Sequence, residues 1–323
     1  MTKKHIHSHG RDKIIWALDP NQDPQLAKNL VAEMKLWAHK LNCDIQPVTV
    51  TDSPSFPMEK VSLYLNKLQV RQLLPTHLII EKLSSARAMA SALARYAERE
   101  KAQFIFVNTH AKKSWIPFQM GGFAESLITT SRVPILIMNT HTRPSLKLSS
   151  VLFPTDFQQD SKRALLHLEP ILRKFDAHVI LYNLVERQNI YPPDVQYSWS
   201  NASRSFTIAS QSVEKTRQKK AKEWIHHLED QNVKCSSVIK PQKRNLSSSI
   251  LDIAKKNHVG LIAMSSTSGP LAQALLGSVA RDVLLQAKCP VLVYYRPKKR
   301  AGVKQPSFQV SQTKGKEGFN YAQ

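Results

Sequence analysis

The sequence Gly277-Ser-Val-Ala-Arg-Asp-Val-Leu284, followed by Cys289-Pro-Val-Leu-Val-Tyr294, decides the fold because an altered copy of it occurs earlier in the chain. That copy reads Gly121-Gly-Phe-Ala-Glu-Ser-Leu-Ile128, followed by Val133-Pro-Ile-Leu-Ile-Met138. In each copy glycine precedes an amphipathic helix, and a proline 13 residues later opens an apolar strand. The two copies are 156 positions apart, which indicates a tandem repeat.

The rest of each half follows one path of alternating strands and helices. Each half opens with an apolar strand that ends on an aspartate, Asp19 or Asp156, and continues into a helix. Strands that alternate with helices of about 10–15 residues are typical of βαβ crossovers and a parallel sheet. Before the closing unit we expect strands at 13–19, 45–51, 76–81 and 104–107, and helices at 24–41, 57–73 and 86–100. In the second half we expect strands at 151–156, 178–184, 233–239 and 261–264, and helices at 161–175, 210–230 and 248–257.

The pattern divides the chain into two α/β domains, residues 12–140 and residues 150–296, joined by a linker at 141–149. Residues 1–11 are basic and rich in histidine, and the tail 297–323 is basic without an apolar period. We expect both segments to be disordered. The second domain carries an additional polar segment at 187–209, which we expect to be a long loop, either mobile or functional.

The charge is strongly basic, with 46 Lys and Arg against 24 Asp and Glu and a net charge of +22. Such a balance suits a nucleic acid, an anionic lipid or an acidic partner. The basic residues are spread over both halves, and the densest cluster lies at Arg296–Arg300. We keep two interpretations of this basic tail, a solvated segment without a partner and a segment that binds nucleic acid. The chain shows no apolar run of about 20 residues and no signal-peptide pattern, so we expect a cytoplasmic protein without a membrane partner.

Sequence motifs for catalysis or for metal binding are missing. The three cysteines, Cys43, Cys235 and Cys289, are far apart and form no CxxC, so we interpret them as small packing residues. Walker A, GxSxG, HExxH and GxGxxG patterns do not occur. We therefore expect no catalytic residues, no metal site and no enzymatic activity.

Two segments of the second half resemble a known family. Val151-Leu-Phe-Pro-Thr-Asp-Phe157 resembles the opening strand of universal stress proteins, and Leu276–Leu284 with Cys289–Val293 resembles their C-terminal signature. The first half is similar through its first strand and its closing unit. The resemblance implies two Rossmann-like (adenine nucleotide alpha hydrolase-like) domains, each with a five-stranded, mostly parallel sheet flanked by helices. It also implies an intramolecular pseudo-dimer through the final strands, with a homodimer of the whole chain as a further option.

The resemblance also implies where a nucleotide would bind. Members of the family that bind ATP or AMP use an aspartate after the first strand and a glycine loop after the fourth. Small residues let phosphates approach the backbone, and the following helix N-terminus offers free N–H groups. The matching positions in the second half are Asp156, Val185, Ser265, Ser268, Gly277, Ser278 and Val279. The degenerate counterpart in the first half comprises Asp19, Asn108, Ala111, Gly121 and Gly122.

The loop departs from the family pattern of G-x-x-G, nine residues, then G-S or G-T. Ser265 and Ser268 replace the glycines, and only eight residues separate Ser268 from Gly277. A Cβ in left-handed backbone costs roughly 1–2 kcal/mol. A simpler interpretation makes the aspartates turn residues and the glycines points of close helix packing.

Three functions remain open at this stage. The first is a universal stress protein that acts in the stress response by binding, with a degenerate nucleotide loop. The second is an ATP- or AMP-binding switch, or a slow ATPase, in the C-terminal domain. The third is a stress protein that associates with nucleic acid through its basic tail.

Overall fold

The computed structural model describes residues 11–70, 73–109, 122–145, 147–185, 199–241, 245–266 and 277–295. Residues 1–10, the tail 297–323 and the candidate site residues Ala111, Gly121 and Ser268 lie outside the described residues. Within the described part of the chain, no helix combines the length and the apolar composition needed to cross a membrane.

Strands and helices alternate through both halves, as the sequence predicts. The first half contains β1 (Asp12–Ala17), α1 (Pro24–Leu41), β2 (Cys43–Thr51), α2 (Met58–Leu68), β3 (His77–Ile80), α3 (Ala86–Arg99), β4 (Phe104–Asn108), α4 (Gly122–Thr130) and β5 (Ile135–Met138). The second half contains β6 (Ser150–Pro154), α5 (Gln159–Phe175), β7 (His178–Val185), α6 (Trp199–Asp230), β8 (Cys235–Pro241), α7 (Leu246–Lys256), β9 (Leu261–Ser266), α8 (Ser278–Gln286) and β10 (Val291–Tyr295).

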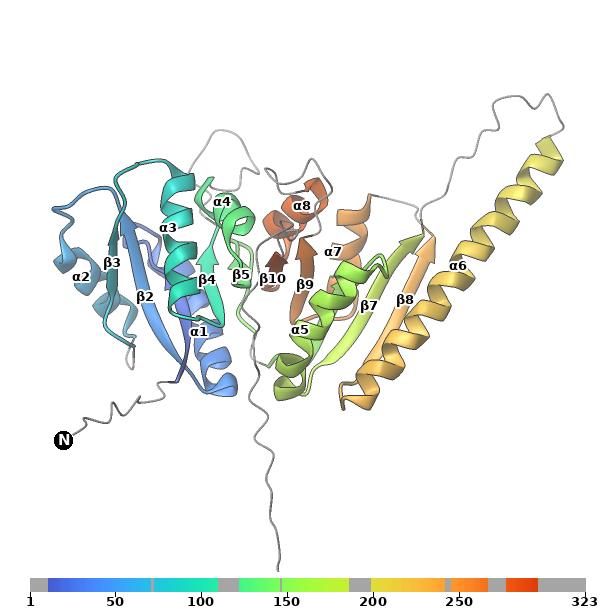
Figure 1. The fold of residues 1–323 in the computed structure, drawn as a ribbon, viewed down its shortest axis with the longest axis horizontal. Coiled ribbons are helices and arrows are strands. Elements are labelled where there is room, and N and C mark those ends of the chain that lie inside the picture. Colours follow the sequence, from blue (N-terminus) through green and yellow to red (C-terminus); the bar gives the residue numbers. More distant parts are fainter. Residues whose placement is uncertain are drawn as a thin grey trace, which may run out of the picture.

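The ten strands form one sheet in the order β3-β2-β1-β4-β5-β10-β9-β6-β7-β8. Each half therefore repeats the order third, second, first, fourth, fifth, which is the order of a Rossmann-like half-sheet. All pairs within a half are parallel, and only the central pair, β5 with β10, is antiparallel. Figure 1 shows the two halves side by side, with β5 and β10 at their junction. The predicted fold class is confirmed.

The junction between the halves is symmetric in sequence position. Leu136 lies opposite Leu292, Ile135 opposite Val293 and Ile137 opposite Val291. Leu136 and Leu292 occupy equivalent places in the two copies of the closing segment, 156 positions apart. The strands thus meet at their equivalent residues, as strands do across a two-fold axis.

Each face of the sheet carries one apolar core that extends through both halves. One core joins residues of α1, α2, α5 and α6 to one face. The other joins α3, α4, α7 and α8 to the opposite face. On the first face Trp37 of α1 is fully buried and contacts Phe175 of α5, with 5.1 Å between ring centroids. The halves are therefore joined by side-chain packing as well as by the sheet.

The linker is packed against both halves. Leu148 is buried, and the Ser145 hydroxyl donates to the Gly260 carbonyl of the second half at 2.8 Å. The Ser145 N–H donates to Glu33 of α1 at 2.6 Å. These contacts fix the position of the linker relative to both halves.

Some boundaries differ from the sequence prediction. The segment 187–209 was expected to be a loop, but α6 begins at Trp199, so residues 199–209 are helical. No Pro or Gly interrupts this stretch. The helix is already packed near its C-terminal end through Trp224 and Leu228, so adding further turns costs little free energy compared with starting a new helix. The helix predicted at 57–73 is shorter, because Gln69 ends it in a left-handed cap.

Candidate functional site

The predicted site residues of the second half gather at the carboxyl edge of the sheet. Asp156 follows β6, Val185 ends β7 and Ser265 lies near the end of β9. These three strands are neighbours in the order β9-β6-β7. Carboxyl ends of adjacent parallel strands are where open α/β sheets bind ligands. Ser265 belongs to the strand itself and pairs with Tyr294 of β10, whereas the sequence pattern placed it in a loop.

Asp156 is engaged by its own neighbours. Its Oδ1 accepts from the Gln158 N–H at 2.9 Å and from the Ser161 hydroxyl at 2.7 Å. Phe157, between them, has a φ of 57° and donates its N–H to the Thr155 hydroxyl at 2.9 Å. Aspartate in such a turn satisfies backbone donors at the start of a helix. The turn-residue interpretation of Asp156 therefore has a structural basis, and Asp156 keeps its Oδ2 as a further acceptor.

Arg217 of α6 is a site residue that sequence reasoning missed. Its guanidinium donates to the Asp156 carbonyl oxygen, which places a fixed positive charge at the carboxyl edge of β6. The two residues are 61 positions apart, so no linear motif joins them. The only available signal was the basic composition of α6.

Asn183 of β7 also contributes to this edge. It is buried, and its side-chain nitrogen donates to the Thr155 carbonyl at 2.8 Å, which ties β7 to the end of β6. Its Oδ1 has no hydrogen-bond partner among the described residues. A buried acceptor beside Asp156 thus retains capacity for a donor group.

The N-terminus of α8 presents the remaining predicted residues. Gly277 is the N-cap, no side chain caps the helix, and Ser278 and Val279 form its first turn. Among the described residues, a Cβ added at Gly277 would meet nothing within 4 Å, so they give the close-packing interpretation of this glycine no support. The free N–H groups of this first turn are suited to an anionic group.

The first-half counterpart is built differently. Asp19 accepts from the Asn21 N–H at 2.8 Å, which is a turn like that at Asp156. Asn108 stands where a glycine would be, but it is buried and its amide donates to the Leu26 carbonyl at 3.2 Å. Gly122 lies within α4, and a Cβ there would make an ordinary contact with Ala86. Asn108 is thus committed to holding β4 against α1.

The thiols of the chain are chemically quiet. Burial raises the pKa of Cys43, Cys235 and Cys289 to about 12 each. Such thiols stay protonated near neutral pH and are poor nucleophiles. Within the described ranges, no group of three His, Cys, Asp or Glu side chains is arranged to hold a metal ion.

Comparisons with known proteins agree with the architecture. Residues 148–294 match the model of the universal stress protein family. Universal stress protein MJ0531 of Methanocaldococcus jannaschii is 30% identical over 168 residues, which cover 50% of this chain and 92% of the relative. The chain therefore belongs to the universal stress protein family.

Solved structures extend the likeness to both halves. A protein of unknown function from Pseudomonas aeruginosa, PA1789, has a TM-score of 0.61 at 14% identity, covering 88% of this chain and 92% of its own. A universal stress protein from Archaeoglobus fulgidus has a TM-score of 0.57 at 12% identity, covering 90% and 98%. At these identities the likeness concerns the fold, and that fold spans nearly the whole of each chain.

Proposed function

We propose that this universal stress protein acts in the stress response by binding rather than by catalysis, with its two domains as one intramolecular pseudo-dimer. The central observation is the β5–β10 junction, where Leu136 and Leu292, equivalent residues of the repeat, lie opposite each other. Two separate subunits would meet in this way across a two-fold axis. The domain boundaries we propose are residues 12–140 and 150–296, with the linker at 141–149.

Side chains at the junction support this reading. Glu125 of α4 forms an ion pair with Arg281 of α8, and these two positions are again 156 residues apart. Asn139, after β5, donates to the carbonyls of Leu284 and Ala287 at 2.8 and 2.9 Å. The Glu125–Arg281 pair thus continues the two-fold relation beyond the strands, and the Asn139 hydrogen bonds add further contacts between the two halves.

The ionisable groups favour binding over catalysis. Catalytic acids and bases are placed in clefts with pKa values adjusted toward the working pH. Among the described residues, burial raises the pKa of Glu33 to about 7, and this carboxyl is fully buried on α1, where it accepts from the Ser145 N–H instead of facing a cleft. The raised thiol pKa values likewise belong to packed residues. The carboxyl-edge residues Asp156 and Arg217 instead form fixed polar contacts.

The test combines phenotype and chemistry. Deletion of the gene in the source cell should lower survival under starvation or oxidative stress, and the wild-type chain should restore it. Leu292→Asp, which places a charge at the centre of the junction, should fail to restore survival, whereas Leu63→Asp on the exposed face of α2 should succeed. Equal rescue by both variants would contradict the pseudo-dimer as the working unit. Phosphate release from ATP above the buffer rate would contradict binding without catalysis.

A nucleotide-binding switch in the C-terminal domain is the second candidate, and α8 is the observation that favours it. The open space at Gly277 and the uncapped helix N-terminus would accept phosphate oxygens, and Asn183 Oδ1 would accept a donor on the same edge. The described residues of the second half therefore fit ATP or AMP. Those of the first half do not, because the Asn108 side chain is committed to α1.

Calorimetric titration with ATP-Mg and AMP distinguishes the two candidates. The switch predicts saturable binding that weakens when Gly277→Val fills the open space, with Gly122→Ala as a matched change in the first half. A dissociation constant of about 1 mM corresponds to a binding free energy of about 4 kcal/mol. Absence of binding heat up to that nucleotide concentration would contradict the nucleotide-binding switch. Mass spectrometry of the purified protein under native conditions gives an independent answer, because a retained nucleotide adds its own mass.

A further inference from the structure

The solvent-facing side of α6 carries a row of lysines. Residues 215–222 read Lys-Thr-Arg-Gln-Lys-Lys-Ala-Lys, a stretch with five basic residues and no acidic one. Lys215, Lys219 and Lys222 are exposed, and Trp224 is buried. Because an α-helix turns by about 100° per residue, the three lysines fall on one stripe opposite Trp224. We call these three residues the α6 lysine row. Figure 1 shows α6 at the outer end of the sheet, beside the edge strand β8.

The α6 lysine row is not neutralised within the part of the chain that the structure describes. No hydrogen bond or ion pair engages its three side chains among the described residues. Arg217 of the same stretch instead donates to the Asp156 carbonyl oxygen, and the neighbouring Glu214 accepts from Gln218 at 3.3 Å. Like charges three and four positions apart on a helix repel each other. The row therefore costs helix stability, and an anion that neutralises it would relieve the repulsion.

The first half shows that the shared fold does not require such a row. The equivalent helix is α2, because α2 and α6 each follow the second strand of their half. Its basic residues are Lys60 and Lys67, and Lys60 donates to the Asn21 side chain. The exposed side of α2 includes Leu63. The lysine row is thus a feature of the second half alone, added to an element that the repeat supplies to both halves.

The spacing of the α6 lysine row suits a line of phosphates. Lys215 and Lys222 are seven positions apart, which is about 10 Å along the helix axis. One strand of B-DNA carries a phosphate about every 3.4 Å of its axis, so it presents about three phosphates over this length. Lysine binds phosphate as a point charge on a flexible stem, which tolerates small differences in spacing.

The residues around the row distinguish between kinds of anionic partner. Within residues 212–230 of α6, no large apolar side chain is exposed. This part of the helix therefore lacks the apolar face that inserts into a lipid surface and the apolar anchor typical of a protein interface. Single-stranded nucleic acids are held by aromatic side chains that stack on bases. The one Phe, Tyr or Trp of residues 212–230 is Trp224, which is buried. A duplex contacted through its phosphates fits this surface best.

We propose that the α6 lysine row binds the phosphate backbone of double-stranded DNA without reading its bases. Contacts to phosphates position a protein on a duplex and carry no sequence information of their own. This binding goes beyond the stress-response role proposed above. It depends neither on the candidate nucleotide site nor on the basic tail.

Fluorescence anisotropy of the full chain with a labelled duplex of about 25 base pairs tests the row. One variant combines Lys215→Gln, Lys219→Gln and Lys222→Gln, which removes three charges and keeps good helix formers. The slope of log affinity against log salt should become less steep by about 2.7, because each phosphate contact contributes about 0.9. Two duplexes of unrelated sequence should bind the wild type within about twofold of each other. Urea unfolding should show a midpoint no lower than that of the wild type, because like-charge repulsion is removed.

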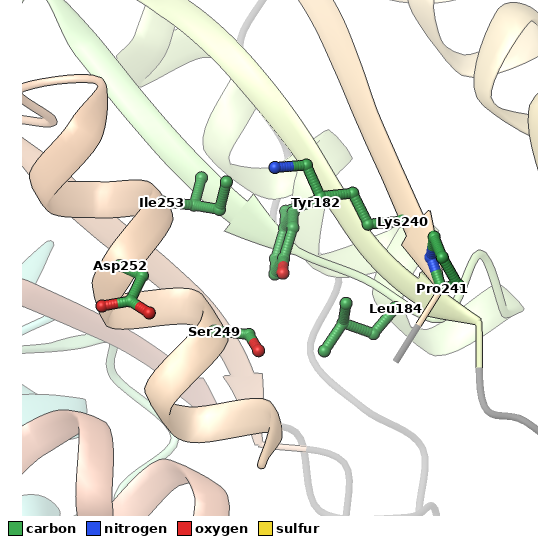
Figure 2. Close-up of a pocket in the computed structure, with 7 residues that line it drawn as sticks. All are labelled: Tyr182, Leu184, Lys240, Pro241, Ser249, Asp252 and Ile253. Atoms are coloured by element: carbon green, nitrogen blue, oxygen red, sulfur yellow. The ribbon is translucent and has the colours of Figure 1, made fainter. Parts of the chain in front are cut away.

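The matched control removes three exposed lysines from the opposite face of the same half. Lys255 and Lys256 end α7, and Lys240 of β8 lies beside Tyr182, on the side of the sheet that α7 covers (Figure 2). Lys240→Gln, Lys255→Gln and Lys256→Gln together give the same net charge as the row variant. Any effect of net charge alone is therefore equal in the two variants, and the control should keep the wild-type salt slope.

Acetylation with an N-hydroxysuccinimide ester locates the contact on the wild-type chain. The duplex should protect Lys215, Lys219 and Lys222 from modification and leave Lys255 as reactive as before. The proposal is overturned by absence of duplex binding at about 50 mM salt or by equal salt slopes for the row and control variants. Tighter row-dependent binding to phosphatidylserine vesicles than to the duplex would also overturn it. So would a loss of binding confined to a full chain with Lys298→Gln, Lys299→Gln and Arg300→Gln, because the tail would then be the binding segment.

Discussion

Glu33 should make the stability of the chain depend on pH in the opposite sense to an ordinary surface carboxylate. It lies in α1 and is fully buried. Its Oε1 accepts from the Trp37 indole N–H at 2.8 Å, and its Oε2 accepts from the Ser145 N–H of the linker at 2.6 Å. Burial raises its pKa from 4.5 to about 7, against the opposing effect of these hydrogen bonds.

The direction follows from proton linkage. The folded state holds the Glu33 proton more tightly than the unfolded state, so the contribution of Glu33 to the unfolding free energy is greatest below about pH 4.5. It falls as the pH rises toward about 7, because ionisation is then easier in the unfolded chain. A pKa rise from 4.5 to about 7, at about 1.4 kcal/mol per unit, corresponds to about 3 kcal/mol.

Urea unfolding of the wild type and of Glu33→Gln, at intervals from pH 4.5 to 8, measures this contribution. The glutamine has no proton to lose, so the wild type should lose about 3 kcal/mol relative to the variant over that interval. The variant should be about 1–3 kcal/mol less stable at the acid end, because its amide cannot accept from both the Trp37 and the Ser145 N–H groups. The indole N–H resonance of Trp37 should shift with a midpoint near pH 7 in the wild type alone. Parallel pH profiles for the two proteins would refute the assignment.

Three further changes test the junction and the thiols. Asn139→Ala leaves the Leu284 and Ala287 carbonyls without their side-chain donor. The free energy of unfolding in urea should therefore fall by about 1–3 kcal/mol. A fall of less than about 0.5 kcal/mol would show that water replaces the amide. A double-mutant cycle at Glu125 and Arg281 should give a coupling energy of at most about 1 kcal/mol, because both side chains are partly exposed and water screens their charges. A coupling energy above about 2 kcal/mol would contradict this screening. The three cysteines should resist iodoacetamide at pH 7.5 in the native protein and react in urea, and rapid native alkylation at any of them would contradict the raised thiol pKa values.

The repeat could be predicted because its signal is local. A glycine, a helix and a proline-opened strand recur at a fixed spacing, and right-handed crossovers then leave few arrangements of the sheet. The early start of α6 could not be predicted, because the polar stretch 199–209 resembles a loop until packing near Trp224 fixes the helix.

The site was harder to predict because its contacts join distant segments. Arg217 reaches Asp156 only once α6 lies along the sheet. Glu33 looks like a solvent-facing residue of an amphipathic helix, but the linker crosses α1 and covers it. In each case the sequence specifies the local element, and tertiary packing determines the environment of the charge.

Hydrogen exchange at the junction tests the account most directly. In the native full chain, peptides covering β5 and β10 should exchange as slowly as those covering β4 and β9, because both faces of the junction are buried and each strand is paired on both sides. The edge strands β3 and β8, each paired on one side, are the internal reference and should exchange faster. Exchange of β5 and β10 as fast as that of β3 and β8 would show two separate domains in solution and would contradict the pseudo-dimer.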